Sequence, residues 1–273
     1  MSRISRRTFL KMTLGTALAP DGFQLVRYRS PETSADSPRT WITSGQAIPS
    51  LNAFDQTVRQ FMQARNISSG ALAVTRQGKL VLARGYSWTT DSTEIVEPDS
   101  LFRIASLTKP FTSAAVMILV QGGKLTLEQK VVDILDLKAP ANQQVDPRLK
   151  NITILHLLQH LGGWDRDTAF DPMFRDVEIA KTLGVKLPIS TGDIITYMNG
   201  KPLQHDPGST YVYSNYGYCL LGRVIEKISK QSYIEYITDN ILNKLGIRSM
   251  VPGRSSLSLR TLGEVKYLSL IHI

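Results

Sequence analysis

The sequence predicts an α/β protein in which a small antiparallel sheet is joined to a mainly helical region. Residues 71–76 and 80–84 alternate apolar with polar side chains around Gln77-Gly78-Lys79, and this pattern predicts a β-hairpin that starts a sheet. Beyond residue 105, apolar side chains recur instead at helical spacing. With 273 residues, 42% hydrophobic and 20% charged, the chain suits one large or two smaller globular domains.

The N-terminal residues predict export. Arg6 and Arg7 precede an apolar stretch, and this order over residues 1–19 resembles a twin-arginine export signal. A basic amphipathic N-terminus is the alternative interpretation. The stretch is far shorter than the ~20 residues that span a bilayer, so we expect a periplasmic or secreted protein without a stable membrane span. Residues 20–49 lack periodicity and are interpreted as a linker.

Helix boundaries are marked by ordinary start and stop residues. Gly122 ends one apolar helical run, Thr153 caps another, and Ser232 with Glu235 forms a capping box. Residues 165–187 have mixed charge and an interrupted pattern, which predicts a surface excursion. The predicted helices cover residues 51–65, 106–121, 154–160, 191–198, 218–228 and 233–245.

Composition argues against several classes of partner. The net charge is +9, but no dense basic run is interleaved with aromatic residues, so no nucleic-acid partner is predicted. His156 and His160 share a helical face, yet they lack the glutamate of a zinc-protease motif and a third ligand. We therefore expect no metal and no cofactor. The single cysteine, Cys219, lies in an apolar run and is predicted to be a buried structural thiol.

Ser106 and Lys109 form the first candidate catalytic pair. They lie one helical turn apart at a predicted helix start, so the amine can approach the hydroxyl. A serine is a poor nucleophile until a neighbour accepts its proton, and a lysine does so when burial or positive charge lowers its pKa. A helix N-terminus also supplies N–H groups for an oxyanion. The competing interpretation is a serine N-cap followed by an exposed lysine.

Tyr213 and Asn215 form the second candidate. They follow the turn at Pro207-Gly208 and precede a helix, so their side chains can project from a short loop into a cleft. A phenol near cations exchanges protons with a serine oxygen more readily, and an amide can orient a substrate carbonyl. Taken alone, the tripeptide is also typical of a surface turn.

Together these blocks resemble the serine beta-lactamase and penicillin-binding protein superfamily, in particular its class C type branch. Residues 102–110 are similar to the family's Ser-x-x-Lys region, residues 152–164 to its second helix and following loop, and residues 207–217 to its Tyr-x-Asn block. The resemblance runs in unbroken order over residues 50–267. It implies a two-subdomain α/β fold, with an all-helical subdomain beside an antiparallel sheet flanked by helices.

The resemblance also implies a role for each site residue. Ser106 would attack an acyl carbonyl, and its backbone N–H would form half of an oxyanion hole. Lys109 and Tyr213 would share the proton transfers, and Asn215 would hold the substrate amide or tune Lys109. Hydrolysis by water would complete a two-step covalent reaction.

One family motif is missing from its usual place. A Lys-Thr-Gly motif or a variant of it should follow Tyr213, but Ser190-Thr191-Gly192 precedes that residue and is better interpreted as a helix start. Residues 268–273 resemble a non-native tail. We therefore expect a catalytic domain, residues 50–267, whose sheet lacks its C-terminal strands, and little or no turnover by this chain.

The sequence thus predicts an exported serine hydrolase that forms an acyl-enzyme on an amide or ester bond. A beta-lactam, a D-amino-acid peptide or a simple ester would be its small-molecule or peptide substrate. The alternative is a non-catalytic module that binds a cell-wall peptide or a partner in the same cleft. The sequence leaves the oligomeric state open.

Overall fold

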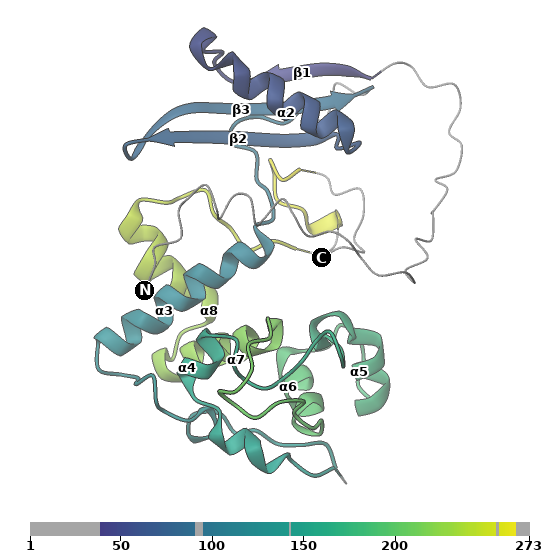
Figure 1. The fold of residues 1–273 in the computed structure, drawn as a ribbon, viewed down its shortest axis with the longest axis vertical. Helices are drawn as coiled ribbons and strands as arrows, with labels where there is room; N and C mark the ends of the chain where they lie inside the picture. Colours follow the sequence, from purple (N-terminus) through teal and green to yellow (C-terminus); the bar gives the residue numbers. More distant parts are fainter. Residues whose placement is uncertain (1–38, 91–94, 142, 255–256, 266–273) are drawn as a thin grey trace.

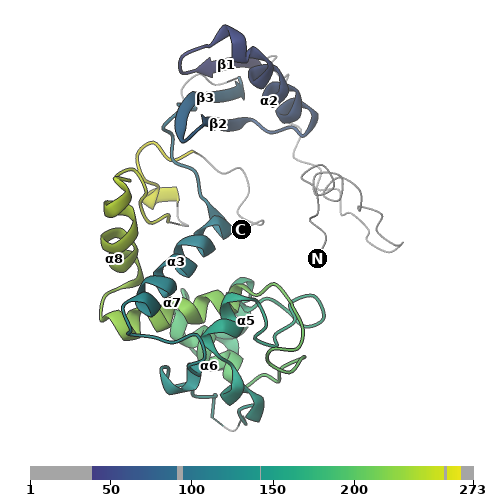
Figure 2. The ribbon, with the colours of Figure 1, turned by 60° about the vertical axis from the view of Figure 1, so that its left-hand side comes forward.

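The computed structural model describes residues 39–90, 95–141, 143–254 and 257–265. Figure 1 shows a small sheet at one end of the molecule and a group of helices at the other. Helix α3 (Thr108–Gln121), the first of that group, begins nearest the sheet and runs toward the other helices (Figure 2). The predicted export signal, most of the predicted linker and the tail at residues 268–273 lie outside the described residues.

The sheet has three antiparallel strands in the order β1-β3-β2 within the described residues. The predicted hairpin is confirmed as β2 (Ser69–Arg76) and β3 (Lys79–Thr89). The extent predicted for the linker is wrong, because residues 40–44 form strand β1 (Thr40–Ser44) along the other edge of β3. Trp41 lies opposite Trp88 in this pair, and their rings stack at 5.7 Å.

Helix α2 (Asn52–Ala64) is anchored to the sheet by a buried polar cluster. The carboxylate of Asp55 accepts hydrogen bonds from the Tyr86 hydroxyl at 2.6 Å and from Arg84 Nε at 3.2 Å. Asp55 and Arg84 are both buried, so the ion pair and its hydrogen bonds fix the position of the helix.

The remaining helices make up the larger part of the molecule. Thr153, Ser190 and Ser232 cap helix N-termini with reciprocal capping boxes, and two of these caps were predicted. After the last helix the chain continues as a π turn (Thr238–Leu242) and a 3₁₀ turn (Asn243–Leu245). The helices are α3 (Thr108–Gln121), α4 (Ile154–Leu158), α5 (Asp176–Leu183), α6 (Thr191–Asn199), α7 (Asn215–Ser229) and α8 (Tyr233–Ile237).

The prediction of a surface excursion at residues 165–187 is wrong in part. This segment contains α5, whose Ile179 is fully buried in the helical core. Helix α5 has only eight residues and buries only one face, so the sequence contains too few apolar residues at helical spacing to reveal it. Cys219, on α7, was predicted to be buried but is only partly buried against the same core. Burial raises its pKa to about 11.

A single hydrophobic core joins the helices and places the ends of two of them together. Helix α7 packs against both α3 and α4. The N-terminal ends of α3 and α7 lie close to each other, because Lys109 Nζ is 2.7 Å from Asn215 Oδ1. None of the helices in the described ranges is long and apolar enough to cross a lipid bilayer. The largest fully buried side chains of this core are Tyr197, Tyr216, Leu119, Leu149, Ile152, Ile154, Leu157, Ile179, Leu220, Leu221 and Ile225.

Candidate active site

The backbone before α3 presents Ser106 at the surface. Residues 105–107 form a 3₁₀ turn that leads directly into α3, so Ser106 lies just before the helix, close to the predicted start. Ala105 has a φ of +42°, a left-handed conformation that residues other than glycine rarely adopt. Such strain costs on the order of 1–3 kcal/mol and is characteristic of functional sites. The serine side chain is therefore held exposed by an unusual turn.

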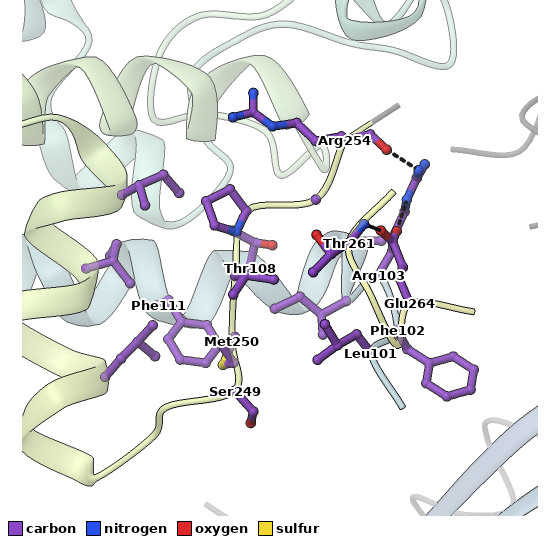
Figure 3. Close-up of a pocket in the computed structure, with 18 of the residues that line it drawn as sticks. Leu101, Phe102, Arg103, Thr108, Phe111, Ser249, Met250, Arg254, Thr261 and Glu264 are labelled. Carbon is purple, nitrogen blue, oxygen red and sulfur yellow. Dashed lines mark hydrogen bonds and ion pairs between the residues drawn. The ribbon is translucent and has the colours of Figure 1, made fainter. Parts of the chain in front are cut away.

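The segment upstream of this turn is tied to the end of the described chain. Leu101 pairs with residues 263–265 through two backbone hydrogen bonds, and Arg103 forms an ion pair with Glu264 at 3.2 Å. Figure 3 shows the pair of Arg103 and Glu264 along one side of a mostly apolar pocket, whose volume is about 900 Å³. Ala105 and Thr108 line the pocket but Ser106 does not. The pocket thus adjoins the exposed serine without containing it.

His160 fixes the loop that carries the second pair of candidate residues. Its carbonyl accepts the N–H of Val212 at 3.0 Å, and its ring Nδ1 accepts the N–H of Ser214 at 3.1 Å. Ser214 in turn caps α7 by accepting the N–H of Gly217. Tyr213 and Asn215, on either side of Ser214, are consequently held at the N-terminus of α7.

The structure brings all four candidate residues together. The Tyr213 hydroxyl donates to Ser106 Oγ at 2.6 Å, and Lys109 Nζ lies 3.4 Å from the same oxygen. Lys109 Nζ also donates to the Tyr213 hydroxyl at 2.5 Å and to Asn215 Oδ1 at 2.7 Å. The three N–H donors of the ammonium group thus have three oxygen acceptors, one from each neighbour.

Despite burial, hydrogen bonds and nearby positive charges lower the pKa of the Tyr213 phenol. Burial alone would raise the pKa of Tyr213, but the hydrogen bonds to Lys109 and Ser106 and the charges of Lys109 and Arg166 together lower it below its usual value near 10. The phenol donates to Ser106 when protonated, and as a phenolate it would accept the serine proton instead. The geometry therefore provides a nucleophile and an adjacent proton acceptor.

Two further residues extend the site and were not predicted. Asn215 Nδ2 donates to Asp171 Oδ2 at 2.7 Å, and Arg166 pairs with that same oxygen at 3.2 Å. The guanidinium of Arg166 lies 5.7 Å from the centre of the Tyr213 ring. Both residues come from the segment that was interpreted as a surface excursion, and no spacing in the sequence marks them.

His156 and His160, the two histidines near the site, form hydrogen bonds within the fold. His156 forms a reciprocal capping box with Thr153 at the start of α4, and the ring of His160 packs against that of Tyr213 at a tilt of 32°, with ring centres 4.7 Å apart. In the part of the chain that the structure describes, no group of three histidine, cysteine, aspartate or glutamate side chains is arranged to hold a metal ion.

Known proteins are similar to this chain in sequence. A family model described as Beta-lactamase matches residues 54–255. The "Probable fimbrial assembly protein FimD, serogroup H1" of Dichelobacter nodosus is 38% identical over 150 residues, which cover 55% of this chain and 35% of that protein. The chain thus spans little more than a third of the curated relatives that it matches first.

Solved structures of related proteins have a similar fold. The octameric penicillin-binding protein homologue from Pyrococcus abyssi superposes with a TM-score of 0.59 at 28% identity, covering 72% of this chain and 43% of that one. The "Beta-lactamase/D-alanine Carboxypeptidase" from Yersinia pestis superposes with a TM-score of 0.54 at 25% identity, covering 71% and 54%. The fold is beta-lactamase-like, and since the family model matches well over half of its length, the chain belongs to the beta-lactamase family, within the superfamily that includes the penicillin-binding proteins.

Proposed function

We propose that this chain carries the reactive centre of a serine hydrolase that forms a covalent acyl-enzyme on an amide or ester bond. The observation that carries the proposal is the convergence on one exposed oxygen: Ser106 Oγ receives the Tyr213 hydroxyl at 2.6 Å and has Lys109 Nζ at 3.4 Å. The hydroxyl of Tyr213, 107 residues further along the chain, and the amine of Lys109, three residues away, meet at this oxygen. A surface serine has no structural reason to gather such partners.

The chemistry follows from this geometry. Ser106 Oγ forms a bond to the carbonyl carbon while its proton passes to the phenolate form of Tyr213 or to the neutral amine form of Lys109, which act jointly. The same proton is then delivered to the leaving nitrogen or oxygen, whose bond to the carbonyl carbon breaks. Water attacks the resulting ester of Ser106, releases the acid and restores the hydroxyl. Asn215 holds Lys109 in place throughout.

The substrate proposed is a beta-lactam, a D-amino-acid peptide or a simple ester. The family model and the name of the Yersinia pestis protein support the first two, because both name enzymes of amide bonds. We further propose that the protein works in the periplasm or outside the cell, on the strength of Arg6 and Arg7. Little or no turnover by this chain itself also stays a proposal.

Covalent labelling tests the proposal directly, because it reports acylation and requires no turnover. The purified chain is incubated with a fluorescent penicillin and, separately, with a fluorophosphonate, and the labelled peptide is identified by mass spectrometry. We expect labelling on Ser106, its loss in Ser106→Ala, and its retention in Ser249→Ala. Ser249 is an exposed serine at the neighbouring pocket and serves as the matched control.

The competing function is distinguished by the same experiment. A folded chain that neither probe labels would contradict the hydrolase and favour a binding module that uses the same surface. Labelling that persists in Ser106→Ala would place the nucleophile elsewhere.

A further inference from the structure

We infer that Asp171 is a positioning residue, which fixes the side-chain amide of Asn215 and through it the amine of Lys109, with Arg166 as its counter-charge. The inference rests on the proposed function, because it assigns a role to groups that lie behind the proposed nucleophile. None of these groups touches Ser106 except Lys109.

The first argument comes from the two ends of one amide. Asn215 donates from Nδ2 to Asp171 at 2.7 Å and accepts at Oδ1 from Lys109 at 2.7 Å. A carboxylate only accepts hydrogen bonds and an ammonium group only donates them. These two neighbours therefore permit a single orientation of the amide. Without the carboxylate, the amide could turn its NH₂ group toward Lys109, and the ammonium would lose an acceptor.

The second argument comes from burial and charge. The side chain of Asp171 is only 8% exposed, so its charge requires partners. Arg166 supplies one at 3.2 Å to Oδ2, and the N–H of Met173 supplies another at 3.1 Å to Oδ1. Both carboxylate oxygens are thus engaged, and the group cannot swing away from Asn215 without losing these contacts.

The third argument comes from the position of the guanidinium. Arg166 is about one-third exposed and lies 5.7 Å from the Tyr213 ring centre, so its charge acts on the phenol as well as on Asp171. The pair of Asp171 and Arg166 therefore reaches both groups that exchange protons with Ser106, through Asn215 on one side and across the Tyr213 ring on the other.

A purely structural role is the alternative, because Asp171 also caps the 3₁₀ turn at residues 172–174. The Asp171→Asn variant retains the size of the side chain but has one acceptor oxygen in place of two. It can satisfy Met173 or Asn215, not both in the present arrangement. Asp167→Asn is the matched control, since Asp167 is an exposed carboxylate of the same loop.

The test is a double-mutant cycle on acylation. The maximal labelling rate constant and the half-saturating probe concentration are measured for the full chain, Asp171→Asn, Asn215→Ala and the double variant. We expect Asp171→Asn to lower the rate constant about 10-fold to 100-fold with little change in half-saturation. In the Asn215→Ala background the same substitution should have almost no further effect, because Asp171 acts through that amide, whereas Arg166, which faces the Tyr213 ring, is retained in both variants.

The outcomes separate the two proposals. Labelling of the full chain with an unchanged rate in Asp171→Asn overturns the positioning role and leaves the hydrolase standing. Additive losses in the double variant also overturn it, because they indicate a general structural effect. Absence of labelling in the full chain overturns the hydrolase and, with it, this inference. If Asp171→Asn does not fold, the labelling rate constant of Arg166→Gln is measured in its place. A rate constant unchanged in both Arg166→Gln and the control Asp167→Asn refutes the inference.

Discussion

Replacing Tyr213 with phenylalanine removes one hydroxyl from the centre of the site and little else. That hydroxyl donates to Ser106 at 2.6 Å and accepts from Lys109 at 2.5 Å, while the ring packs on His160 at 4.7 Å between centres. The ring contacts survive in Tyr213→Phe. Positioned acid–base groups typically contribute about 100-fold to 10,000-fold in rate, so we expect acylation to slow at least about 100-fold.

Tyr218→Phe provides a matched control for this loss. Its ring also packs against His160, with centres 5.0 Å apart, but its hydroxyl contacts Ser113 and the carbonyl of Leu158 instead of Ser106. Each variant loses hydrogen bonds worth about 1 kcal/mol each in stability. Stopped-flow labelling and chemical denaturation should therefore show similar stabilities and very different acylation rates. Equal acylation rates in the two variants would refute the reasoning.

The pH dependence of the acylation rate provides a second test of the role of Tyr213. Burial opposes ionisation of Tyr213, but the cations around it lower the pKa below its usual value near 10. The phenolate, which accepts the serine proton, is the form that gains population as pH rises. Acylation of the full chain should thus increase with pH, with a midpoint below the usual tyrosine value near 10, and Tyr213→Phe should lack that limb.

Two further predictions concern the sheet. Asp55→Ala leaves the buried guanidinium of Arg84 without its carboxylate, so the free energy of unfolding, measured by urea denaturation, should fall by about 3–5 kcal/mol. Asp136 belongs to an exposed ion pair, and Asp136→Ala should leave the denaturation midpoint unchanged. Gly85→Ala would place a Cβ atom 2.0 Å from the carbonyl oxygen of Val96, so overpacking should cost about 1–3 kcal/mol, and a wild-type melting temperature would contradict this.

Features that depend on neighbouring residues could be predicted from the sequence. Thr153 and Ser232 cap their helices through bonds that span only three residues, and the hairpin turns at Gln77 and Gly78, which both adopt positive φ. The pairing of Ser106 with Lys109 is equally local, because one helical turn separates them. Local contacts are encoded in a short window of sequence, so a pattern in that window identifies them.

Features that depend on distant partners could not be predicted in the same way. Strand β1 (Thr40–Ser44) is stabilised by pairing with β3, about 45 residues further along, and by one tryptophan stack. Asp171 contacts Asn215 across 44 residues of sequence. A single aspartate in a polar loop is indistinguishable from a solvated one until the chain is folded. Tyr213 and Asn215 could be connected with Ser106 and Lys109 only through the resemblance to a family, because about a hundred residues separate the two pairs.

His160 shows how the local and the distant parts of the site depend on each other. Burial first, and then the nearby charge of Lys109, lowers the pKa of His160 below 6.5, so its ring is neutral at neutral pH. Only a neutral ring leaves Nδ1 free to accept the N–H of Ser214. Protonation would remove that acceptor and place a second cation beside Lys109. Because the folded-state pKa is depressed, the stabilisation that the neutral ring provides is present above the unfolded-state value near 6.5 and is lost as the pH falls below it. The loop that aligns Tyr213 with Ser106 therefore depends on a histidine that takes no part in the proposed proton transfers.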